Sequence, residues 1–225
     1  MGAGVSVVTA GARMRIGTTA GMAGAIAILA GSVAAAIAYT GKAGEAYSPL
    51  HHFVSELGEP GVSALGPEFN VGLIVGGIGF AVFMAMLASS TTGAPRVAYG
   101  VVGVIAGIAG FFVGVFPMNF TAQHGLAAMT FFNLGWIAVA LASIDFVRRR
   151  DPRFPRRLAV VGGLTVLAFI AFLVSIRVDP IIAESSLGTP VERPTVWIVP
   201  ALEWAVIAGI LLWTFLVAWT WRRAG

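Results

Sequence analysis

The sequence predicts an all-α membrane protein: a polytopic bundle of six transmembrane helices with both termini in the cytoplasm. Three observations predict it. Hydrophobic residues make up 58% of the 225 positions and charged residues only 11%, whereas soluble domains carry about 25% charged residues. The apolar residues fall into six long runs, and the basic residues gather in alternate connections between those runs. This pattern is typical of an integral membrane protein.

The first apolar run spans about 16–39 and follows Arg13 and Arg15. At 1.5 Å per residue it is long enough to cross a hydrocarbon core of about 30 Å. A cleaved signal peptide is the alternative, because the Ala-Ile-Ala sequence at 36–38 resembles a small-residue cleavage site. The run exceeds the usual ~7–15 residues of a signal-peptide core, so we expect a retained helix.

Residues 48–70 lie between two apolar runs and are too polar to cross a bilayer, with two of the three histidines and three prolines. We interpret this stretch as a structured loop that caps one face of the bundle. The second and third spans, about 69–88 and 97–116, follow it. Five glycines between 100 and 114 recur every three or four residues, so they share one stripe of the third helix. Such a stripe allows close helix packing, and we expect this helix to be the interior member of the bundle.

The fourth, fifth and sixth spans are predicted at about 125–147, 158–178 and 197–219, and the whole chain, 1–225, is predicted to be a single membrane domain. The connection 148–157 carries six arginines and two prolines and cannot enter the bilayer. With both termini inside, eleven of the fourteen basic residues lie in the cytoplasm and eight of the ten acids lie outside, as the positive-inside rule requires. We expect a multi-pass protein of a prokaryotic cell membrane, because the Arg-, Ala- and Gly-rich composition suits a GC-rich bacterial genome.

All three histidines lie on the predicted outer side, where His52 and His124 could cluster with Glu56, Glu68 and Glu203 as a metal site or as general acids and bases. Solvated loop histidines are the alternative. The sequence lacks an HxxxH or HExxH spacing, so we predict no metal site and no cofactor. The catalytic candidates are His124, Glu203 and Glu56.

Glu203 lies about one turn inside the sixth span, where a charged group costs up to ~2.5–3.5 kcal/mol at full depth. We therefore expect it to be buried and paired with His52, His124 or Asn70, although it could instead reach the interface. Ser55 follows His52 by three positions and is a conceivable nucleophile, but a helix or turn cap is the favoured interpretation. Asn70 is expected to bond a neighbouring helix or to hold the loop.

Several motifs together resemble the domain-of-unknown-function 998 (DUF998) family of prokaryotic membrane proteins. They are Val-Ser-Glu-Leu-Gly at 54–58, Phe-Asn at 69–70, Gly-Val-Phe-Pro at 114–117, and His124. That family is itself similar to the eukaryotic Frag/DRAM/Sfk group, some of whose members are linked to lipid remodelling. The resemblance implies a six-helix bundle whose outward-facing polar site consists of Ser55, Glu56, Asn70, His124 and Glu203, with His52 nearby. A Glu-Arg pair of the family is not kept, because Trp204 follows Glu203.

Two functions follow as expectations. The first is binding or remodelling of a lipid at the outer leaflet, and the alternative is a non-enzymatic membrane scaffold or regulator. A pocket shared by His124, Glu203 and Asn70 would favour the first, and closed bonds between helices would favour the second. Membrane lipids are the expected partners, a second copy of the chain or another membrane protein remains open, and nucleic acid is set aside because the arginines follow membrane topology.

Overall fold

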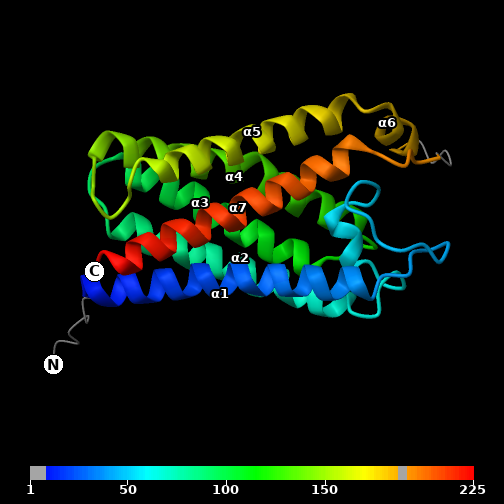
Figure 1. Ribbon diagram of the computed structural model, residues 1–225, viewed down its shortest axis with the longest axis horizontal. Coiled ribbons are helices and arrows are strands. Elements are labelled where there is room, and N and C mark those ends of the chain that lie inside the picture. The colour runs from blue at the N-terminus through cyan, green and yellow to red at the C-terminus, as the bar shows by residue number, and fades with distance from the viewer. Residues whose placement is uncertain (1–8, 187–191) are drawn as a thin grey trace.

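A computed structural model describes residues 9–186 and 192–225 and confirms the six long apolar helices (Figure 1). They are α1 (Ala10–Ile37), α2 (Gly66–Ser89), α3 (Pro95–Val115), α4 (Thr121–Arg149), α5 (Arg157–Val178) and α7 (Ile198–Arg223). Two short helices join them: the 3-10 helix η1 (Val54–Gly58) and α6 (Pro180–Ser186). Each long helix is apolar and long enough to cross a membrane.

The bundle has two distinct ends. Helix α1 begins and α7 finishes at the same end, which we call the terminal end (Figure 1). The opposite end, which we call the loop end, carries η1, α6 and the long connection between α1 and α2. This arrangement agrees with an even number of crossings, while the assignment of the terminal end to the cytoplasm stays a prediction.

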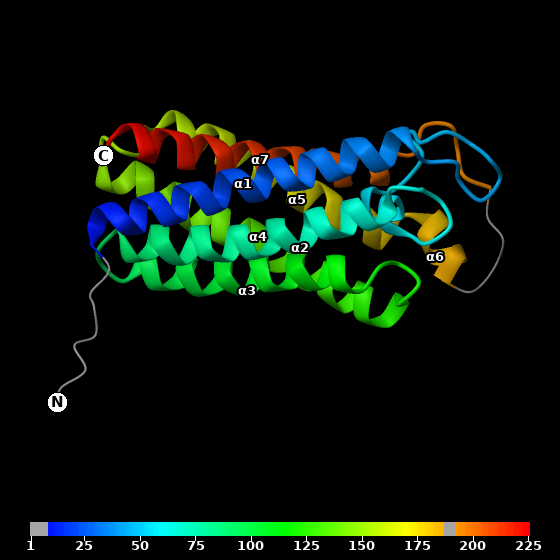
Figure 2. The same cartoon turned by 90° about the horizontal axis from the view of Figure 1, so that it is seen from below.

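The six long helices form a ring. They pack in the order α1, α2, α3, α4, α5 and α7, and α7 closes the ring by packing against α1. The side view in Figure 2 shows α7, α1, α2 and α3 following one another around the bundle. Helices far apart in the sequence therefore face a common interior.

The glycine stripe of α3 explains its contact with α2. A methyl group at Gly107 would lie 2.6 Å from the backbone nitrogen of Ala81 in α2, so only glycine permits this approach. The predicted packing stripe is confirmed, but the prediction that α3 is the interior helix is wrong. Its opposite face exposes large apolar side chains, including Val101 and Ile105. Lipid accepts such a face as readily as protein does, so a stripe on one side does not require burial on the other.

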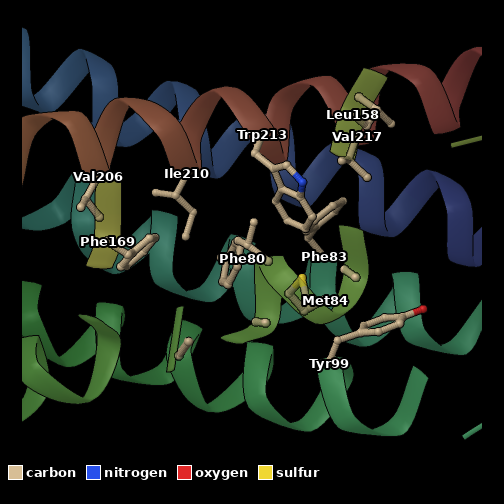
Figure 3. Packing of buried hydrophobic residues seen from close by; sticks show 14 of the residues in the cluster. Phe80, Phe83, Met84, Tyr99, Leu158, Phe169, Val206, Ile210, Trp213 and Val217 are labelled. Atoms are coloured by element: carbon tan, nitrogen blue, oxygen red, sulfur yellow. The ribbon is translucent and has the colours of Figure 1, made fainter. Parts of the chain in front are cut away.

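Buried aromatic and aliphatic side chains from different helices pack together in the interior (Figure 3). The indole of Trp213 in α7 meets Phe83 of α2 edge to face at 6.2 Å and stacks near Phe146 of α4. Trp213 and Phe83 are fully buried. This aromatic cluster ties three helices together.

The connection between α1 and α2 is a structured loop, as predicted. The backbone N–H of Thr40 donates to Val62 O at 2.8 Å, and the Ser63 hydroxyl donates to Ala35 O at 2.8 Å. These bonds fold the loop back onto the end of α1. The fold thereby holds η1 over the loop end of the ring.

Candidate functional site

A cavity of about 800 Å³ lies within the ring, and residues from all six long helices line it. We call it the loop-half cavity. Its wall is mainly apolar, with Leu73, Phe132 and Ile207 among its side chains. Phe80 and Ile210 belong both to this wall and to the hydrophobic core that contains Trp213 and Phe83, so this core borders the cavity.

Polar side chains join the cavity wall from the loop end. We call these five the mouth residues: Ser55, Thr121, His124, Arg193 and Glu203. They come from η1, from the first turn of α4, from the segment before α7, and from the second turn of α7. Three of the predicted site residues, Ser55, His124 and Glu203, are thus brought to one cavity.

Glu203 is buried, with 5% of its surface exposed. Its Oε2 accepts a hydrogen bond of 2.6 Å from the backbone N–H of Val54 in η1. The prediction of a buried and paired Glu203 is confirmed, but the predicted partners are wrong. The partner is a main-chain donor of the loop rather than His52, His124 or Asn70, because η1 folds directly over the start of α7.

His124 is held in one orientation at the start of α4. Its Nδ1 lies 2.8 Å from the carbonyl oxygen of Phe116. A carbonyl oxygen only accepts, so Nδ1 carries the proton, and the other nitrogen of a neutral ring, Nε2, is an acceptor. His124 therefore contributes a hydrogen-bond acceptor to the cavity wall.

Glu56 makes an ion pair that sequence spacing did not indicate. Nη1 of Arg193 donates to both carboxylate oxygens of Glu56, at 2.9 and 3.0 Å, and the backbone N–H of Phe53 adds a bond of 3.0 Å. The Glu56 side chain is 7% exposed and that of Arg193 is 38% exposed. The pair ties the first turn of η1 to the segment that precedes α7, and Glu56, not Ser55, caps η1.

A second, polar pocket of about 330 Å³ lies beside this ion pair. Its lining includes Lys42, Glu45, His52, Glu56, Glu59 and Arg193. Arg193 and Met118 line both this pocket and the loop-half cavity. The two hollows are therefore neighbours.

His52 is part of a buried aromatic group rather than a free base. Its Nδ1 accepts the backbone N–H of Ser48 at 3.1 Å, and its Nε2 lies 3.6 Å from the Glu45 carboxylate. The ring also stacks on Tyr47 at 5.5 Å. Both ring nitrogens are thus engaged away from Ser55, and the geometry does not support a Ser55–His52 nucleophile.

Tyr47 links this group to α7. Its hydroxyl accepts a bond of 2.6 Å from Nε1 of Trp204 and donates toward the carbonyl oxygens of His52 and Phe53, each at 3.2 Å. Burial raises the pKa of the Tyr47 phenol, so the hydroxyl keeps its proton at neutral pH. Neither Tyr47 nor Trp204 was predicted as a site residue, because their contact joins residues far apart in the chain.

Two other predicted residues lie outside the cavity lining among the described residues. Asn70 donates from Nδ2 to Gly58 O at 3.0 Å, so it holds the loop, which was one of its two expected roles. Glu68 is exposed in the first turn of α2. Within residues 9–186 and 192–225, no three His, Asp or Glu side chains form a group that could hold a metal ion.

The ring of six apolar helices, with its polar cap at one end, defines a multi-pass helical membrane protein. The chain belongs to the family described as "Protein of unknown function (DUF998)", whose model matches residues 22–220. The predicted resemblance to that family is confirmed, and the more distant similarity to the Frag/DRAM/Sfk group stays a prediction. No curated protein and no solved structure matches the chain.

Proposed function

We propose that this protein binds an amphiphilic lipid, with the hydrocarbon chain in the loop-half cavity and the polar group among the mouth residues. The observation that carries this proposal is the cavity itself: about 800 Å³ of space with an apolar wall and polar groups drawn from the loop end. That volume is within the ~300–1,000 Å³ of typical ligand sites, which are likewise apolar with a few placed polar groups.

The energetics of an apolar hollow support an occupant. Side chains that line an empty cavity lose their van der Waals partners on one side, and water gains little in a space with few polar groups. Hydrocarbon chains surround the protein at high concentration. A lipid chain is therefore the most available molecule that restores contacts with Leu73, Phe132 and Ile207.

Binding fits the distribution of polar groups better than transport does. A solute path needs polar side chains along the depth of the bundle. Here the charged lining residues, Arg193 and Glu203, belong to the loop end, and deeper in α7 the lining adds the uncharged hydroxyl of Thr214. We propose that the loop end faces the outer leaflet of a prokaryotic cell membrane, because eleven of the fourteen basic residues belong to the other side.

A pair of glycine variants tests the proposal. Gly125 lines the cavity, and a methyl group added there would meet no atom within 4 Å. Gly125→Phe is therefore expected to occupy the cavity without displacing the helices. Gly163 of α5 has the same open surroundings but is exposed outside the cavity lining, so Gly163→Phe is the matched control.

The measurement is native mass spectrometry of protein purified in mild detergent. We expect lipid adducts on the wild type and on Gly163→Phe, and their loss from Gly125→Phe. Equal adducts on all three proteins, or a wild type without adducts, would overturn the proposal and leave a scaffold or regulator as the better interpretation.

A further inference from the structure

The polar atoms at the mouth of the loop-half cavity select the kind of headgroup that fits there. We propose that the ligand's polar group donates hydrogen bonds and carries no negative charge, as in a long-chain amine or alcohol. This inference rests on the proposed function, because the cavity must hold the hydrocarbon chain that carries the headgroup.

Two mouth residues offer acceptors to a ligand. Glu203 contributes a carboxyl group that is 5% exposed and accepts hydrogen bonds from the backbone N–H groups of Val54 and Ser55. His124 donates its Nδ1 proton to Phe116 O and leaves Nε2 as an acceptor. The hydroxyls of Ser55 and Thr121 can donate or accept. A ligand group with donors therefore satisfies this end of the cavity.

The cation at the mouth is already neutralised. Arg193 donates to both oxygens of the Glu56 carboxylate, and its guanidinium lies 5.5 Å from the centre of the Trp197 ring. An anionic headgroup would have to displace Glu56, which is itself buried and would lose its ion-pair partner. It would also lie beside the Glu203 carboxyl group, which offers it no positive charge.

The neighbouring polar pocket strengthens this discrimination. Its lining contains three carboxylates, from Glu45, Glu56 and Glu59, and two cations, from Lys42 and Arg193. Carboxylates that outnumber cations around an opening attract positively charged groups and repel negative ones. The charge near the mouth thus favours an amine or a neutral alcohol over a carboxylate or a phosphate.

A matched set of amphiphiles with one chain length tests the inference. The probe is hexadecanol that carries a photoreactive diazirine in its chain, and the competitors are hexadecylamine, hexadecanol, palmitate and hexadecyl phosphate. We expect the amine and the alcohol to block labelling of the full-length protein at concentrations at least about tenfold lower than the two anions, the factor expected of one hydrogen bond to a charged group.

Two variants test whether Glu203 is responsible for the headgroup preference. Glu203→Gln removes a carboxyl group that can carry the counter-charge of an ammonium headgroup but keeps an oxygen that accepts from Val54, so we expect it to weaken competition by hexadecylamine about tenfold. Glu68→Gln removes an exposed carboxylate outside the cavity lining and is expected to leave all four competitors unchanged. The headgroup series on the wild type decides the question even if a variant folds poorly.

The outcomes separate this inference from the proposed function. Equal competition by all four amphiphiles, with labelling lost in Gly125→Phe, would overturn the inference and leave lipid binding in place. Stronger competition by palmitate or hexadecyl phosphate would also overturn it and would assign the headgroup to Arg193. Absence of labelling at cavity residues would instead overturn the proposed function.

Discussion

The carboxylate of Glu203 in α7 accepts a 2.6 Å hydrogen bond from the backbone N–H of Val54 in η1. The bond joins the last membrane helix to the loop that follows the first one. Both residues are buried, with 5% and 3% of their surfaces exposed. The contact therefore sets where η1 lies over the loop-half cavity, and it shapes the mouth as well as the fold.

Glu203→Ala is expected to lower the free energy of unfolding by about 1–3 kcal/mol, because it leaves the Val54 N–H buried without its acceptor. Glu203→Gln keeps an oxygen that accepts from Val54, so its free energy of unfolding should fall by less than that of Glu203→Ala. The measurement is unfolding in detergent, together with hydrogen exchange at residues 54–58. Glu68→Ala, an exposed site in α2, is the control and should stay within about 0.5 kcal/mol of the wild type. Equal stability of Glu203→Ala and Glu203→Gln would contradict the prediction.

The Glu56–Arg193 pair should show measurable coupling in a double-mutant cycle. Arg193→Met leaves the Glu56 carboxylate buried without its cation, so it should lower the free energy of unfolding by about 1–3 kcal/mol. The double variant, Arg193→Met with Glu56→Gln, should lower the free energy of unfolding by less than the two single variants do in sum. The Lys42–Glu59 pair, at 2.7 Å with the Lys42 side chain 75% exposed, is the comparison and should couple by less than about 1 kcal/mol. Coupling of the same size in both pairs would argue against a special role for Arg193.

The Glu203–Val54 and Glu56–Arg193 contacts also show what the sequence could and could not predict. The six helices were predictable because each must bury or expose apolar side chains over the full depth of a bilayer. The burial of Glu203 followed from its position inside a span. Its partner did not, because every residue except proline carries a backbone N–H and the side chains give no sign of which one is used.

Arg193 and the cavity were missed for a related reason. Arg193 pairs with a carboxylate 137 positions away, so no local spacing connects them. The cavity results from six helices closing into a ring, whereas glycine stripes and apolar runs report only pairwise contacts. Sequence patterns predicted that α3 packs closely on a neighbouring helix, but they did not predict that this neighbour is α2 or that the space beside the contact stays open.

At the terminal end, stability should depend on the ionisation of Asp151. Hydrogen bonds from the Arg153 side chain, which lies 2.6 Å from Oδ2, lower the pKa of this carboxyl group below its usual range. The folded-state pKa thus lies below the unfolded value of about 3.9, so the stabilisation is present above that pH and is lost as the pH falls through the folded pKa. We expect the stability difference between the wild type and Asp151→Asn to shrink below about pH 4.

Unfolding measured from neutral to acidic pH checks this dependence. The same comparison in an Arg153→Met background is the control, because without the guanidinium the pKa of Asp151 should return toward its usual value. A difference between wild type and Asp151→Asn that stays constant through the acidic range would show that Asp151 acts by its shape rather than by its charge.

The orientation of the ring decides which leaflet supplies the cavity. The chain has no cysteine, so single cysteines can be labelled without background. Ala46 is exposed at the loop end, and Arg148 is exposed at the terminal end. Because arginines collect on the cytoplasmic side, a membrane-impermeant maleimide should label Ala46→Cys in intact cells and Arg148→Cys only after permeabilisation. The reverse pattern would place Glu203 and His124 at the inner leaflet, and the ligand would then have to come from cytoplasmic lipids.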